Sequence, residues 1–356
     1  MSAPPDAAPA GGSDRLAFNA SLGRAFTAAI AATGVLDQDL RIAGRTLRLR
    51  FAGRALVEPM TRALRHLATA PADAPDLTIG VWDGDTSGVA LPPCPWPLPD
   101  FFVRCDAITH DWGERVHAAF AIQSGLMQYF DEDARLAIAW ARDAARLQAW
   151  TRAAPLRALI AGWAESIGAS AAHAAAVGID GRGVLLPAPS GSGKSTTALA
   201  CLARGFQLAG DDLVLLRDGD EGPTAHTVYG SAKIAPGQLA SGGPGVRAPP
   251  DPDALISENK RVLWLDELYP RQLADHLALR AIVVPRLSAR GQTALRPTSR
   301  AEVVRALVPP TLFMLPGVGR RSYERLVAVT GALPAFALEL GPDHDRNVAA
   351  LRGLIT

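Results

Sequence analysis

The stretch that decides the fold of this chain is LLPAPSGSGKSTTALACLARGFQLAGDD, residues 185–212. An apolar segment leads into a loop of glycine and serine, and a helical pattern, a short apolar segment and two aspartates follow. Glycines let backbone N–H groups close around a phosphate without clashes of Cβ atoms, and a helix that begins there adds its positive N-terminal dipole. Strand, loop and helix in this order are the context that such a loop requires. The sequence therefore predicts an α/β protein with a P-loop.

The loop itself supplies the predicted nucleotide contacts. These are Ser190, Gly191, Ser192, Gly193, Lys194, Ser195 and Thr196. In loops of this type the lysine reaches the outer phosphates and the serine hydroxyl ligates magnesium, so ATP and Mg²⁺ are the expected cofactors. The usual pattern has a glycine five residues before Gly193, where this chain has Ala188. We expect Ala188 to tighten the entrance of the loop without removing a phosphate contact.

Two acids, Asp211 and Asp212, follow the short apolar segment FQLA. The first strand after a P-loop helix commonly pairs beside the P-loop strand, so its end can lie at the phosphates. One acid can then hold the metal, and the other can accept a proton from an attacking hydroxyl. The structural alternative is a solvated turn, with Gly210 and Asp211 as a turn dipeptide.

Composition excludes several classes of protein. The net charge of +1 provides no basic field for nucleic acid. The three widely spaced cysteines form neither a zinc pattern nor a disulfide framework, which favours a reducing cytoplasm. No apolar run reaches the roughly 18 residues of a membrane span, and the N-terminus does not resemble a signal peptide. We therefore expect a cytoplasmic protein without a nucleic-acid or membrane partner.

The 356 residues suggest two domains after a short tail. Residues 1–14 are small and polar, and a disordered tail is expected there. Residues 15–150 alternate strand and helix patterns without a nucleophile or ligand cluster, which predicts a smaller α+β domain for recognition or assembly. Residues 151–356 contain the P-loop and form the predicted catalytic domain. Within it, residues 236–253 are rich in proline and glycine, and we expect a long loop that is functional or disordered.

A second set of motifs downstream suggests an alternative. LASGGPG, residues 239–245, resembles the signature of ABC transporter ATPases, and RVLWLDEL, residues 261–268, resembles their metal-binding strand with Asp266 and Glu267. The segment between Lys194 and Ser241 is too short for the helical subdomain of such ATPases, and no glutamine-bearing loop is found. A strand followed by a polar turn also explains Asp266 and Glu267. This ATPase remains an alternative, as does a nucleotide-gated binding module.

Within residues 171–212, AHAAAVGIDGRGVLLPAPSGSGKSTTALACLARGFQLAGDD resembles the catalytic core of the HPr kinase/phosphorylase family. That family has a histidine near the start of a hairpin, a P-loop on its second strand and an acid pair soon after the helix. The residues that match are His173, Lys194, Ser195, Asp211 and Asp212. YGSAKIAPG, residues 229–237, and LPGVGRRSYERLVAVTGALPAFALELG, residues 315–341, look like a divergent bacterial branch of HPr-kinase-like proteins. That branch includes kinases that phosphorylate lasso-peptide precursors.

The resemblance implies a P-loop kinase core of the HPr kinase type and transfer of a phosphoryl group from ATP to a serine hydroxyl. It implies that Asp211 accepts the hydroxyl proton, that His173 supports it, and that magnesium lies on Ser195 and Asp212. Taken alone, a histidine such as His173 is more often structural. Lys233 and Lys260 flank the proline- and glycine-rich segment, where they could neutralise transferred charge or lie in solvent.

Two departures from the family pattern concern the acceptor. The chain lacks the downstream signature with arginine and glycine that true HPr kinase/phosphorylases have. Thr196-Thr197 also stands where those enzymes usually have an acidic residue just after the loop. The expected acceptor is therefore a peptide or small protein, and a ribosomally made precursor peptide is the first choice. The alternative function is that of an HPr-type regulatory kinase, whose acceptor is HPr. Self-association into a homo-oligomer is left open.

Overall fold

The first sheet begins with the hairpin that alternation of apolar and polar residues predicts. The computed structural model describes residues 12–95, 108–109, 114–240, 243–249, 254–257, 259–315 and 319–356. In spatial order the strands of this sheet are β1 (Val35–Ile42), β2 (Arg45–Ala52), β3 (Leu77–Asp83), β7 (Leu136–Ala141), β6 (Leu126–Asp131), β5 (Val116–Ala121) and β4 (Ile108–Thr109). Strands β1 and β2 are antiparallel and turn at Ala43 and Gly44, both with positive φ. The hairpin prediction is confirmed.

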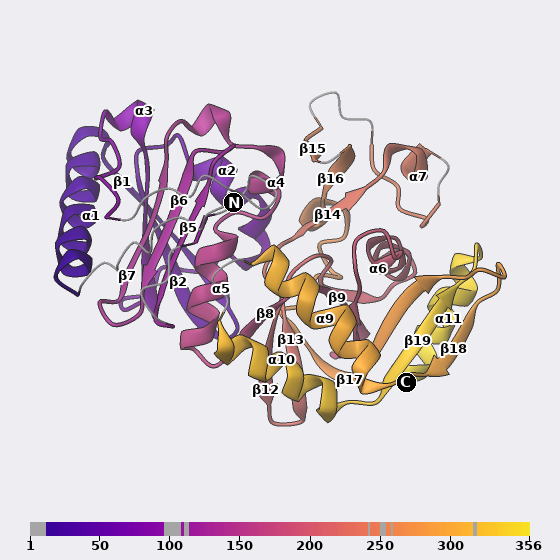
Figure 1. Ribbon diagram of the computed structural model, residues 1–356. Helices are drawn as coiled ribbons and strands as arrows, with labels where there is room; N and C mark the ends of the chain where they lie inside the picture. The colour runs from indigo at the N-terminus through magenta and orange to yellow at the C-terminus, as the bar shows by residue number, and fades with distance from the viewer. Residues whose placement is uncertain are drawn as a thin grey trace, which may run out of the picture.

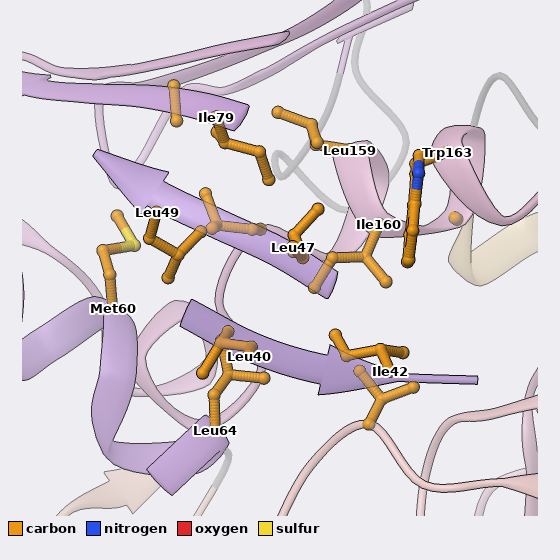
Figure 2. Close-up of a cluster of buried hydrophobic side chains, with 14 of the residues drawn as sticks. Leu40, Ile42, Leu47, Leu49, Met60, Leu64, Ile79, Leu159, Ile160 and Trp163 are labelled. Carbon is orange, nitrogen blue, oxygen red and sulfur yellow. The ribbon is translucent and has the colours of Figure 1, made fainter. Parts of the chain in front are cut away.

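Helices cover both faces of this sheet. Helix α1 (Gly12–Thr33) packs on the outer face, at the left of Figure 1. The opposite face packs against α2 (Val57–Thr61), the 3-10 helix η1 (Arg62–Leu67) and α5 (Arg157–Ser166). Figure 2 shows Leu159, Ile160 and Trp163 of α5 against strand residues such as Leu47. Short connecting elements are α3 (Gly84–Ser87), η2 (Ala144–Arg146) and α4 (Ala149–Ala153).

The second sheet carries the glycine- and serine-rich loop that the sequence predicts to be a P-loop. Its main path in spatial order is β11 (Gln207–Gly210), β9 (Ala174–Ile179), β10 (Arg182–Pro187), β17 (His276–Leu287), β13 (Gly222–His226), β12 (Val214–Gly219) and β8 (Ser170–Ala172). Strand β19 (Ala335–Leu340) pairs in parallel with β17, and β18 (Ala294–Pro297) pairs with β19. Parallel and antiparallel pairs therefore occur in one mixed sheet.

The two faces of the second sheet are covered by different helices. Ala175 and Val177 of β9 pack with α6 (Lys194–Leu202) and α11 (His344–Ile355). Ala174 and Ala176 pack on the other side with α9 (Arg300–Met314) and α10 (Arg320–Ala332). This alternation of faces is the period of two that a strand dictates. Figure 1 shows α9 and α10 crossing the sheet on the side away from α6.

A small third sheet lies beside the N-terminal end of α6. Its strands are β14 (Ser231–Ile234), β16 (Lys260–Trp264) and β15 (Ile256–Ser257), and α8 (Leu265–Leu268) follows β16. No helix in the described ranges is long and apolar enough to cross a membrane.

The structure corrects two predictions of irregular structure, the disordered tail at residues 1–14 and the long loop at residues 236–253. Helix α1 begins at Gly12, so residues 12–14 belong to a helix, while the rest of the predicted tail, residues 1–11, lies outside the described residues. The proline- and glycine-rich segment 236–253 opens with helix α7 (Pro236–Ala240) instead of a loop. Residues 241–242 and 250–253 of that segment lie outside the described residues.

Candidate functional site

Three neighbouring strands bring the predicted site residues to one edge of the second sheet. Strand β9 is antiparallel to both β10 and β11, so β10 and β11 end at the edge where β9 begins. His173 directly precedes β9, the P-loop follows β10, and Asp211 follows β11. The prediction that β11 pairs with β10 is wrong, because β9 of the hairpin lies between them. The acids still reach the phosphate loop, because β10 and β11 run in the same direction.

The backbone of the loop explains its glycines. Gly191 and Gly193 have φ of 84° and 92°, in the left-handed region that favours glycine. A Cβ on Gly193 would also lie 2.4 Å from Cδ1 of Leu340, so this leucine side chain would have to shift. Ala188 is fully buried and its φ is not positive, so its backbone conformation does not require glycine.

Lys194, His173 and Asp212 form one polar cluster in front of the loop. Nζ of Lys194 lies 2.9 Å from Nε2 of His173 and 3.4 Å from Oδ1 of Asp212. Nε2 of His173 lies 3.0 Å from the same carboxylate oxygen, and its tautomer decides whether it donates there or accepts from Lys194. Lys194 is only 6% exposed, so the cluster neutralises a buried ammonium.

The two adjacent aspartates have opposite electrostatic surroundings. Burial raises the pKa of Asp211, and the charge of Asp212 raises it further. Lys194, the Ser195 hydroxyl and the backbone of Lys233 lower this pKa, but the net shift is upward. Burial would also raise the pKa of Asp212, but Lys194, His173 and Lys233 together hold the pKa of Asp212 well below its usual range. Asp212 therefore stays ionised, whereas Asp211 holds a proton more readily.

Asp211 has one oxygen that is not used by the fold. The residue is 2% exposed, and within the part of the chain that the structure describes its Oδ1 has no hydrogen-bond partner. A buried carboxylate oxygen without a donor is costly, and such atoms are common where a ligand supplies the missing group.

A cavity of about 1240 Å³ opens in front of the loop. Of the predicted site residues, it is lined by His173, Ser190, Gly191, Gly193, Lys194, Ser195, Thr196, Asp211, Asp212, Lys233 and Lys260. Ser192 does not line it, and its hydroxyl instead donates a hydrogen bond to the carbonyl of Pro189 at 2.7 Å. The structure thus brings both lysines that flank segment 236–253 to the same cavity as the loop.

Several lining residues were not predicted from the sequence. Arg157, Tyr229, Arg305 and Phe313 contribute from α5, the approach to β14, and α9. Tyr229 is the first residue of the stretch YGSAKIAPG quoted above, whereas Arg157, Arg305 and Phe313 belong to no motif. These four residues share only their place in the cavity. That place depends on tertiary structure, because α5 and α9 meet the edge with the loop only when the two larger sheets pack together.

The alternative metal-binding strand of an ABC-type ATPase does not reach the loop. Asp266 and Glu267 lie on α8 and accept from Arg62 of η1, at 3.4 Å and 2.5 Å. Neither residue lines the cavity. Arg62 also stacks over the ring of Trp264, with 4.8 Å from Cζ to the centroid. These acids therefore join the second half of the chain to the first and do not face the phosphate loop.

The donors at the loop fit a magnesium ion. The Ser195 hydroxyl and the carboxylates of Asp211 and Asp212 are oxygen ligands, which Mg²⁺ prefers. Magnesium sites in nucleotide-binding proteins commonly use one or two carboxylates together with substrate phosphates. The small number of acids is therefore sufficient for a metal that arrives with a nucleotide.

No protein-family model matches the chain, and no curated protein sequence matches it. Among solved structures, the chain is similar to the HPr(Ser) kinase/phosphatase from Coxiella burnetii, with 13% sequence identity and a TM-score of 0.29. The match covers 52% of this chain and 97% of that chain. Both similarity values are low, so the function proposed below rests on the geometry of the site.

Proposed function

We propose that this protein is an ATP-dependent kinase that transfers the γ-phosphoryl group to a serine hydroxyl of a peptide or small protein. The observation that supports this most is Asp211, which lines the cavity at the loop and whose buried Oδ1 lacks a partner among the described residues. A binding module that catalyses nothing needs no proton acceptor at this position, whereas a kinase needs one for the acceptor hydroxyl and an ATPase needs one for water. The assay with a labelled acceptor described below separates these two enzymes. Residues 15–150 and 151–356 are proposed as the recognition and catalytic domains.

In this proposal Asp211 acts as the general base. Its pKa is raised mainly by burial, which makes the carboxylate a better proton acceptor than an ordinary aspartate. The acceptor hydroxyl gives its proton to the Asp211 carboxylate as its oxygen attacks the γ-phosphorus. The bond from that phosphorus to the oxygen that bridges it to the β-phosphate breaks, and ADP leaves. His173 holds Lys194 and Asp212 in place through its Nε2. This arrangement orients the reacting groups before the reaction begins.

The P-loop and Lys194 hold the phosphates. Backbone N–H groups of the loop and the N-terminus of α6 provide donors for phosphate oxygens, and Lys194 provides a charge. We assign Ser195 and Asp212 as the magnesium ligands, because the low pKa of Asp212 keeps it anionic. Magnesium bound with ATP neutralises charge that develops on the phosphates. Lys233 and Lys260 are proposed to face the same charge from the third sheet.

The proposed acceptor is a flexible peptide, and the first candidate is a ribosomally made precursor of the lasso type. A hydroxyl must approach the γ-phosphate in line and within hydrogen-bond reach of Asp211. A flexible chain can enter a cavity to do so, whereas a serine buried in a folded domain cannot. HPr remains the alternative acceptor.

The test compares Asp211→Asn, Asp212→Asn and Lys194→Ala with Asp218→Asn, which makes the same change on an exposed residue of β12 outside the cavity. Each variant is titrated with a non-hydrolysable ATP analogue, with and without Mg²⁺. Each is then incubated with ATP and either HPr or a synthetic serine-containing peptide, and mass spectrometry detects added phosphate. Circular dichroism checks that each variant folds.

We expect Lys194→Ala to lose transfer, Asp211→Asn to keep nucleotide affinity but lose transfer, and Asp212→Asn to lose magnesium-dependent affinity as well. Asp218→Asn should behave as the unchanged protein. Full transfer by folded Lys194→Ala would refute the P-loop assignment. If Asp211→Asn alone loses metal-dependent affinity, the roles of the two acids are reversed, and ATP hydrolysis without a labelled acceptor would favour an ATPase.

A further inference from the structure

Two arginines that line the cavity are not used by the fold. Arg157 begins α5, and Arg305 lies on α9. Among the residues that the structure describes, the guanidinium group of neither arginine has a partner in a hydrogen bond or an ion pair. Arginines in this protein are otherwise frequently paired, as Arg48 is with Asp39 and Arg204 with Asp345. Two unpaired guanidinium groups in one cavity indicate a binding site for an anion.

Arg157 is held at the cavity by a conformation that the fold imposes. Leu156, directly before it, has a φ of 56° although it is not a glycine, and its side chain is fully buried. Left-handed backbone is unfavourable for leucine, so the packing of Leu156 must fix it. The consequence is that α5 begins at the cavity wall and that the Arg157 side chain is directed there.

Arg157 lies on the same side of the site as the catalytic acids. Tyr229 donates a hydrogen bond from its hydroxyl to the carbonyl of Pro155 at 2.8 Å, which places this ring against the start of α5. Burial raises the pKa of Tyr229, Arg157 lowers it, and Asp212 raises it. Arg157, Tyr229 and Asp212 all line the same cavity.

Arg305 approaches the site from α9. The backbone N–H of His173 donates to Oγ1 of Thr311 on that helix at 2.9 Å, so α9 is in direct contact with the catalytic cluster. Further along α9, Pro309, Pro310 and Phe313 also line the cavity, and Phe313 is 51% exposed. This wall combines a cation with exposed apolar surface, which suits a peptide more than a second phosphate group.

The cavity has a second wall, apart from α5 and α9, that can bind the nucleotide. On the other side of the loop, the cavity is lined by Leu287, Leu340, Pro342 and His344, at the ends of β17 and β19 and the start of α11. In a P-loop protein the acceptor attacks from beyond the γ-phosphate, and the nucleoside extends away from it. His173, Asp211 and Asp212 mark the γ-phosphate end, so the wall of α5 and α9 belongs to the acceptor.

We propose that Arg157 and Arg305 bind a carboxylate close to the target serine, so that the kinase selects acidic acceptors. This inference rests on the proposed function, because it assigns the acceptor side of the same site. The carboxylate comes either from the C-terminus of the peptide, with the serine at or near the end, or from an aspartate or glutamate side chain beside the serine. Both offer the planar pair of oxygens that a guanidinium binds in bidentate fashion.

The experiment uses four fluorescent peptides of one length and otherwise one sequence around a single serine. One has a free C-terminal carboxylate next to the serine, and the other three have an amidated C-terminus. Of these three, one has aspartate two residues from the serine, one has lysine there and one has alanine. Binding is measured by anisotropy with the full-length protein saturated with Mg²⁺ and a non-hydrolysable ATP analogue, and phosphate incorporation is measured with ATP.

Arg157→Gln and Arg305→Gln are compared with Arg24→Gln, which removes an exposed arginine of α1 that lies outside the cavity. We expect at least one carboxylate peptide to bind about tenfold or more tightly than the alanine peptide, and the lysine peptide to bind most weakly. Arg157→Gln and Arg305→Gln should each reduce this ratio, whereas Arg24→Gln should keep it. The carboxylate that is preferred, terminal or side-chain, identifies its source.

Equal binding of the carboxylate and alanine peptides to the unchanged protein, or no binding of either, overturns the inference. A preference that survives in both arginine variants also overturns it. These results leave the proposed function intact if nucleotide binding still depends on Lys194. Nucleotide binding that is the same in folded Lys194→Ala as in the unchanged protein would instead overturn the proposed function.

Discussion

Asparagine substitutions at Asp211 and Asp212 should change stability in opposite directions. In Asp212→Asn the ammonium of Lys194, 6% exposed, loses the carboxylate that lies 3.4 Å from it. Breaking a fully buried ion pair costs about 3–5 kcal/mol, and an exposed pair contributes about 0–1 kcal/mol. The Asp212 side chain is 35% exposed toward the cavity, so an intermediate loss of about 2 kcal/mol is expected. For a chain of 356 residues that corresponds to a fall of about 3 °C in the melting temperature.

Asp211→Asn should not destabilise the protein and should raise its melting temperature. The folded protein holds the pKa of Asp211 above the unfolded value, mainly through burial. A carboxyl with a raised pKa favours folding below its unfolded pKa, and this contribution is lost as the pH rises through the folded pKa. The neutral amide avoids that loss, so the advantage of Asp211→Asn should grow as the pH increases above about 3.9.

Calorimetry or circular dichroism melts at several pH values between 4 and 8 measure both effects without nucleotide, with Asp218→Asn as the control. A fall in melting temperature for Asp211→Asn comparable to that of Asp212→Asn would refute the argument from burial. An unchanged melting temperature for Asp212→Asn would refute the importance of its pair with Lys194. A saturating ATP analogue should reduce the deficit of Asp212→Asn, because phosphate provides Lys194 with another anion.

Two further substitutions test the loop and the contact between the two halves of the chain. Gly193→Ala should weaken binding of an ATP analogue much more than Gly191→Ala, because both have positive φ but only the Cβ at position 193 would meet Leu340, at 2.4 Å. Equal effects of the two variants in a titration would show that the backbone conformation alone matters. Arg62→Ala should lower stability by about 1–2 kcal/mol in denaturant melts, because it leaves Asp266 and the face of Trp264 without their cation, whereas Glu267 keeps its pair with Arg65. Nucleotide affinity should not change. A loss of nucleotide affinity in Arg62→Ala would indicate that the contact also shapes the cavity.

Local sequence was sufficient for the P-loop unit and for most elements around it. The order of strand, Gly/Ser loop and helix predicted β10 and α6, because positive φ and phosphate binding demand these residue types in this order. Alternation predicted the β1–β2 hairpin, and helical spacing predicted α5. The elements that were missed include β18 and α11, and α9 continues through Pro309 and Pro310 to Met314. Tertiary packing stabilises that last turn against the local preference of proline to end a helix.

The association of His173, Lys194 and Asp212 is a property of the sheet. Sequence suggested these residues through a motif and a resemblance, but the distances between them depend on β9 lying between β10 and β11, an order that no local pattern specifies. The different surroundings of Asp211 and Asp212 likewise depend on burial, which adjacent identical residues cannot reveal.

The sequence by itself predicted a phosphate-binding loop, because the residue types that such a loop needs stand at seven consecutive positions. Only the tertiary structure decided what lies opposite that phosphate. Arg157 and Arg305 are separated by most of the catalytic half of the chain, and the packing of α5 and α9 around the second sheet brings both to one cavity. The physical reason is that a strand or helix pattern records only whether a residue faces the core, whereas the position of a polar side chain depends on non-local contacts between elements.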